Sequence, residues 1–189
     1  NATLNGKVFS IPSPIETALL LKSKGGAFDG SILNDPDNVD NYTTASKKAL
    51  AMGIYGTDLG YSTIYDQNQQ SVGYIKAVKK LSNDLGISGA FDEKLTERFM
   101  ENGNNQDSLL SLVSEAYSNG DKFLKDNKRD DVAIKILTGG WIESIYFAGE
   151  VCKKSKNQEI MNRIGEQKPT LQNLLSIYRS SEPTSDLTM

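Results

Sequence analysis

The sequence contains no histidine, and this absence removes several kinds of chemistry at once. Histidine is the most common general base in enzymes, a usual zinc ligand and the side chain that titrates near neutral pH. Any chemistry must therefore rest on carboxylates, lysines, tyrosines or the single thiol. We expect neither a metal ion nor another cofactor, we assign no catalytic residue, and an enzymatic role is the less favoured one.

Cysteine is almost absent as well, because Cys152 is the only one. No disulfide can form within this chain, and the thiol follows directly on an apolar run over 142–151. A nucleophilic thiolate usually depends on a histidine partner, which the chain lacks. We therefore expect a buried or half-buried structural thiol.

Long apolar runs and clusters of positive charge are also missing. No segment approaches the 18 or so consecutive apolar residues of a membrane-spanning helix. The 21 basic residues are scattered among 24 acidic ones, which gives a net charge of −3. A nucleic-acid partner would need a basic face, so we expect none.

Along most of the chain, apolar residues recur at the spacing of a helix. Ser13, Pro14 and Glu16 form a helix-start signature of N-cap, first-turn proline and capping box. No stretch alternates polar and apolar residues in a way that a helix does not explain better. The predicted helices cover 14–24, 44–65, 69–86, 91–102, 107–127, 129–155, 159–164 and 169–179.

This pattern predicts an all-α, single-domain bundle of about seven or eight helices. Its 189 residues are enough to bury a self-sufficient core. We expect an extended N-terminal segment over 1–12, a helical domain over 13–179 and a disordered polar tail over 180–189. The connection over 26–41 is unusually long, so it either packs on itself or has a function. Its acidic residues lack the spacing of a calcium loop.

Three glycines interrupt the predicted helix 44–65, and each costs about 1 kcal/mol relative to alanine there. Gly53, Gly56 and Gly60 lie within a narrow sector of a helical wheel, so they form a groove that a second helix can enter. Gly139 and Gly140 supply a matching surface in the helix 129–155. The glycines thus predict a close crossing between these two central helices.

Each of the two glycine-bearing helices also carries an acidic residue among apolar neighbours. Asp58 and Glu143 are therefore predicted to be at least partly buried, and a buried acid must be hydrogen-bonded, paired or protonated. Two alternatives follow. The acids are structural acceptors for tyrosine hydroxyls, free backbone amides or lysines, or they form a carboxylate pair that acts on a glycan or holds a metal. The structural alternative is favoured.

Aromatic residues surround the two acids in the sequence, and they complete a candidate ligand site. This tentative site consists of Asp58, Tyr61, Tyr65, Trp141, Glu143 and Tyr146, with Tyr55 nearby. The hydrolase alternative requires both carboxylates to open into one cleft. Enclosure of the carboxylates favours a structural role.

Four segments together resemble a group of uncharacterised all-helical proteins of Bacteroidetes-type Gram-negative bacteria, which are secreted proteins or lipoproteins. They are "IPSPIETALLLKSKG", "YTTASKKALAMGIYGTDLGY", "LSNDLGI" and "GGWIESIYFA". The resemblance implies a periplasmic or surface location, with membrane contact only through a lipid anchor upstream of the present start. It supplies no activity and no site residue.

These observations lead to two functional expectations of different class. The favoured one is a non-enzymatic cell-envelope protein that binds a small molecule, a glycan or an envelope protein. The alternative is a carboxylate-dependent hydrolase that acts on glycan or cell-wall material through Asp58 and Glu143.

Overall fold

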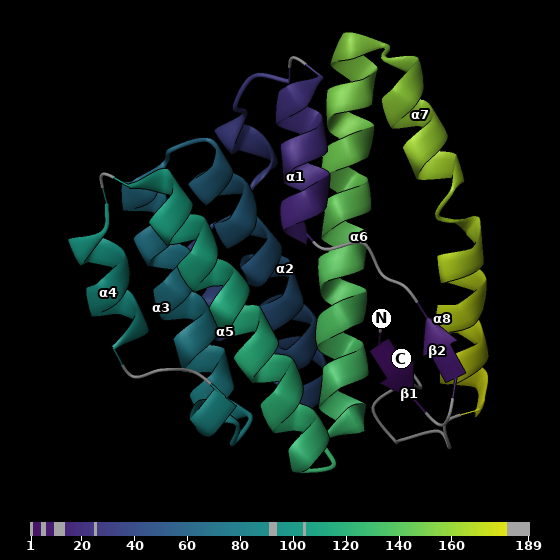
Figure 1. The fold of residues 1–189 in the computed structure, drawn as a ribbon. Helices are drawn as coiled ribbons and strands as arrows, with labels where there is room; N and C mark the ends of the chain where they lie inside the picture. The colour runs from purple at the N-terminus through teal and green to yellow at the C-terminus, as the bar shows by residue number, and fades with distance from the viewer. Residues whose placement is uncertain are drawn as a thin grey trace.

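The structure is a computed structural model that describes residues 2–4, 7–9, 14–24, 26–90, 94–103 and 105–180. From Pro14 onward, the described residues form one all-α bundle of eight α-helices, as the sequence predicts (Figure 1). The helices are α1 (Pro14–Ser23), α2 (Ala45–Ile64), α3 (Asn68–Asp84), α4 (Leu95–Glu101), α5 (Gln106–Asp126), α6 (Asp130–Ser155), α7 (Gln158–Gly165) and α8 (Lys168–Ser180). Short 3-10 helices η1 (Gly30–Ile32), η2 (Pro36–Asn41) and η3 (Ser88–Ala90) lie in the connections.

Helix α2 lies at the centre of the bundle and contacts α1, α3, α5 and α6. It begins at the N-cap Thr44, whose hydroxyl oxygen accepts a hydrogen bond from the Lys47 amide at 3.2 Å. From Ala49 onward almost every residue of α2 is buried. Its many glycine, alanine, serine and threonine residues let four neighbouring helices approach it.

The closest approach in the bundle is between α2 and α6, at glycines of both helices. A Cβ atom added to Gly53 would lie 1.9 Å from the Ile136 carbonyl oxygen, and one added to Gly139 would lie 2.0 Å from the Leu50 carbonyl oxygen. The Thr57 hydroxyl lies between the carbonyl oxygens of Gly53 at 3.0 Å and Gly140 at 3.3 Å. The backbones are therefore in direct contact, which confirms the predicted glycine-mediated crossing.

The other two glycines of the predicted groove face different helices. A Cβ atom on Gly56 would meet the hydroxyl of Tyr117 in α5 at 2.7 Å, and one on Gly60 would meet Ile15 of α1 at 3.6 Å. The prediction of one glycine face toward one partner is therefore wrong in this detail. The reason is that α2 is surrounded, so a modest turn around its axis leads from one neighbour to the next.

Apolar side chains gather on both sides of this central pair. One cluster joins α2 to α3, α4 and α5, and it contains Leu81 and Phe99. A second joins α1, α2, α6 and α7, and the half-buried thiol of Cys152 packs against it, as predicted. A third connects α6 to α8, and α8 lies on the side of α6 away from α3–α5 (Figure 1). No described helix combines the length and apolar character needed to cross a membrane.

The N-terminal segment contains a short β-hairpin that the sequence analysis did not predict. Strands β1 (Ala2–Leu4) and β2 (Lys7–Phe9) pair in antiparallel fashion, with Thr3 opposite Val8. The predicted N-cap Ser13 and, apart from Ser180, the predicted tail over 180–189 lie outside the described residues.

The crossing predicts that a single methyl group at Gly53 is costly. Gly53→Ala places its Cβ against α6 backbone that cannot move aside, so we expect a loss of about 3 kcal/mol or more in the free energy of unfolding. Gly149→Ala in α6 is the matched control, because no atom lies within 4 Å of the added carbon. It should gain up to about 1 kcal/mol from helix propensity. Urea unfolding of both variants measures the difference, and equal stabilities would contradict the crossing.

Candidate functional site

Asp58 and Glu143 meet at the side chain of Asn34, which comes from the connection between α1 and α2. The Asn34 Nδ2 atom donates to Asp58 Oδ2 at 3.4 Å and to Glu143 Oε1 at 3.1 Å. Asp58 is 0% exposed and Glu143 is 6% exposed, so both acids are enclosed. One amide group thus links the two central helices through their acidic side chains.

Asn34 is held in place by the segment 26–42, which we call the strap. The strap runs back along α2, from Gly26 beside Tyr65 to Tyr42 beside Tyr55. Two tyrosine hydroxyls donate to its backbone near the middle. The Tyr74 hydroxyl donates to the Asn34 carbonyl oxygen at 3.0 Å, and the Tyr55 hydroxyl donates to that of Asp35, also at 3.0 Å.

The electrostatics of the pair favour protonation, because no lysine or arginine is bonded to either acid among the described residues. Burial, reinforced by the charge of Glu143, raises the pKa of Asp58 to about 9, although hydrogen bonds from Asn34 oppose the shift. Burial raises the pKa of Glu143 to about 7 against the same opposition. Asp58 therefore carries a proton at neutral pH.

Two of the predicted aromatic site residues, Tyr61 and Tyr65, bond to the strap and not to the acids. The ring centroid of Tyr61 is 4.7 Å from that of Tyr65 and 4.8 Å from that of Phe147. The Tyr61 hydroxyl oxygen accepts from the Asp29 amide at 3.2 Å, and the Tyr65 hydroxyl donates to the Gly26 carbonyl oxygen at 2.7 Å. These tyrosines fasten the first part of the strap.

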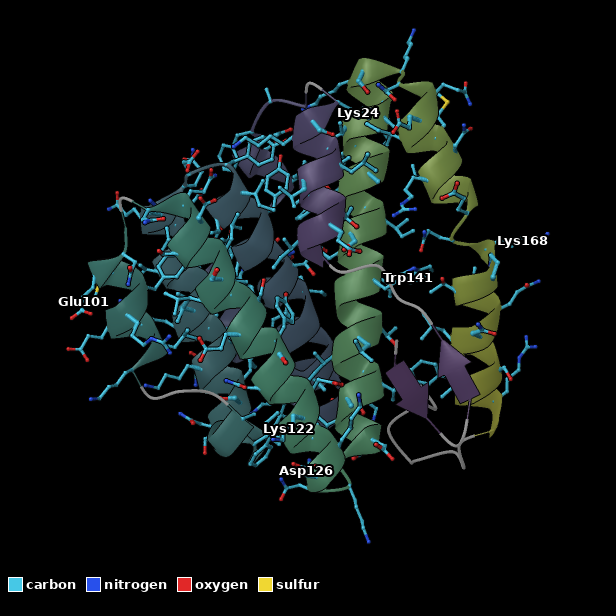
Figure 2. The ribbon with its side chains drawn as sticks, in the orientation of Figure 1. Lys24, Glu101, Lys122, Asp126, Trp141 and Lys168 are labelled. Atoms are coloured by element: carbon cyan, nitrogen blue, oxygen red, sulfur yellow. The ribbon has the colours of Figure 1, made fainter. Side chains whose placement is uncertain are left out.

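The other two predicted aromatic residues point away from the acids. Trp141 lies on the side of α6 that faces α7 and α8 (Figure 2), and its indole N–H donates to Gln167 Oε1 at 3.2 Å. It borders a small cleft that Thr17, Ser144 and Arg163 also line. Tyr146 is 45% exposed on the outer surface of α6. The six predicted residues therefore do not line one common cavity.

The structure changes the expected partner of the acids. The expected donors are tyrosine hydroxyls, lysines or free backbone amides, whereas the donor common to both acids is the side-chain amide of Asn34. The hydroxyls of Tyr55 and Tyr74 donate to carbonyl oxygens of the strap instead. Asn34 was missed because it lies 24 residues from Asp58 and 109 from Glu143. The available signal was the unusual length of the connection that carries it.

Within the described part of the chain, no group of three or more histidine, cysteine, aspartate or glutamate side chains could hold a metal ion. The chain finds no match among protein-family models, curated protein sequences or solved structures.

Loss of the Asn34 amide, the donor that both acids share, should destabilise the fold. Asn34→Leu leaves both buried acids without the amide that serves them, so we expect a loss of about 2–4 kcal/mol in unfolding free energy at pH 7. Asn38→Ala, an exposed asparagine of the same strap, is the control and should change stability by less than about 0.5 kcal/mol. Similar losses from both variants would show that Asn34 has no special role.

The effect of replacing Asp58 on the free energy of unfolding should depend on whether the new side chain can still accept a hydrogen bond from Asn34. Asp58→Asn keeps a carbonyl oxygen for Asn34 and resembles the protonated acid, so we expect a change below about 1 kcal/mol. Asp58→Leu removes the acceptor and should cost about 1–3 kcal/mol. Denaturant unfolding at pH 5, where the parent is protonated, compares the neutral forms directly. A harmless Asp58→Leu would contradict the structural role of this acid.

Proposed function

We propose that this chain is a non-enzymatic, helical cell-envelope protein that binds a partner through the outer face of α6. We place it in the periplasm or at the surface of a Gram-negative bacterium, held by a lipid anchor upstream of the present start. The location rests on the resemblance of four segments to secreted and lipid-anchored helical proteins. The binding role rests on the surface of the molecule.

The observation that carries the binding role is a pair of exposed apolar side chains on the central helix. Ile142 is 49% exposed and Tyr146 is 45% exposed, and they lie one helical turn apart. Tyrosine combines a large apolar ring with a hydroxyl and is enriched at the energetic centres of interfaces. A convex helix face suits an envelope protein or a glycan chain better than a small molecule, which needs a concave site.

The hydrolase alternative is less well supported, because a substrate has no access to Asp58. A glycosidase needs one carboxylate on each side of the scissile bond. Here Asp58 is 0% exposed, and Asn34 occupies the space between the two acids. The enclosed pair suits a structural role in the bundle.

Site-directed photo-crosslinking in intact cells tests the binding role. A photoreactive residue at position 146 should yield one discrete crosslinked product, which should disappear when Ile142→Asp is added. The control carries the same probe at Lys122, an exposed position on α5 (Figure 2). Products of equal yield at both positions, or recovery of the full-length protein from the cytoplasm, would overturn the proposal.

A separate assay addresses catalysis. The purified chain should release no soluble product from cell-wall glycan, and neither Asp58→Asn nor Glu143→Gln should change that result. Release by the parent that both substitutions abolish would establish the hydrolase in place of the binding protein.

A further inference from the structure

The acid pair lies beneath the middle of the strap, where Asn34 reaches both α2 and α6. The Asn34 side chain donates to both acids, and the Asn34 backbone carbonyl oxygen accepts a hydrogen bond from the Tyr74 hydroxyl. Asp58 Oδ1 is buried and has no hydrogen-bond partner among the described residues. The middle of the strap is therefore the cover that separates an incompletely bonded acid from water.

The pair lacks a compensating positive charge. The charged and titratable groups around it are Glu143 on α6, Asp35 in the strap, and Tyr55, Tyr74 and Tyr117 on α2, α3 and α5. All of these groups are neutral or negative in the folded protein. Two ionised carboxylates on one amide, without a cation, would repel each other in a place that water does not reach.

We propose that a proton on the Asp58–Glu143 pair keeps the strap closed, and that loss of this proton in mildly alkaline solution opens the strap around Asn34. Opening hydrates Asp58 and relieves the repulsion between the two carboxylates. The ends of the strap stay in place independently of the acids. The Tyr65 hydroxyl donates to the Gly26 carbonyl oxygen, Asp29 is paired with Lys154, and Asp40 is paired with Lys80.

The direction of the effect follows from linkage. Asp58 binds its proton more tightly in the closed state, where its pKa is about 9, than in an open state, where the pKa returns toward its ordinary value of 3.8. The stabilisation of the closed state is complete below the ordinary pKa and is lost as pH rises toward 9. Glu143 contributes in the same direction up to about pH 7. Between pH 7 and 9 a single proton from Asp58 is released on opening.

Amide hydrogen exchange in the strap tests this proposal. The Leu33 amide, which donates to the Gly30 carbonyl oxygen, and the Asn38 amide, which donates to the Asp35 carbonyl oxygen, lie on either side of Asn34 and are the reporters. After correction for intrinsic base catalysis, the opening constant should rise about tenfold per pH unit from pH 7 to 9. In Asp58→Asn it should not change with pH. Asp84→Asn, an acid-to-amide change on α3, should leave the parent behaviour intact.

Two further measurements keep the proposal testable if Asp58→Asn does not fold. Glu143→Gln removes the neighbouring charge, so the rise in opening should level off at a lower pH than in the parent. The carboxyl carbon of Asp58 should show the chemical shift of a protonated acid at pH 7. An ionised Asp58 at pH 7, or strap protection that is equal at pH 7 and 9 in the parent, would overturn the proposal.

Discussion

Direct backbone contact between α2 and α6 is the constraint on which the rest of the structure depends. It requires glycine at Gly53 and Gly139, because even a methyl group at either position would overlap a carbonyl group of the other helix. The two helices also run in the same direction, since Leu50 meets Gly139 and Tyr61 meets Phe147 further along both chains. Close parallel packing places the middle of α2 where side chains of ordinary size have little room, and this accounts for its composition of small residues.

The direction of the helices explains the length of the strap. Helices α1 and α2 also run parallel, because Ile15 lies beside Gly60 and Lys22 lies beside the end of α2, where its ammonium group donates to the Ile64 carbonyl oxygen. A chain that leaves α1 must therefore return the full length of α2 before α2 can begin. A return path of this length along a buried helix needs hydrogen-bond partners for its backbone. The hydroxyls of the α2 and α3 tyrosines provide them.

Much of this arrangement can be read from the sequence, and the parts that cannot are long-range. The helices, the glycine crossing and the burial of Asp58 follow from local patterns, because periodicity is a property of neighbouring residues. The hairpin was missed although Asn5-Gly6 in the sequence is a dipeptide typical of hairpin connections. The role of Asn34 could not be predicted from local patterns, because it depends on where the long connection between α1 and α2 passes over α2 and α6. Trp141 and Tyr146 were grouped with the acids by proximity in sequence, yet neighbouring positions on a helix point in different directions.

The position of the acid pair is itself a consequence of the close crossing. At Gly53 and Gly140 the backbones touch and leave no room for a side chain between them, whereas one turn further along Asp58 and Glu143 have room beneath the strap. An apolar pair there would have left the Asn34 amide without acceptors in a buried place, at a cost comparable to that of a lost hydrogen bond. Ionised acids would have lacked a cation. A protonated pair meets both conditions, because a carboxyl group still accepts from Asn34 and carries no charge. The same arrangement makes the strap sensitive to pH. The stability of the closed strap depends on a proton that is released to water when the strap opens.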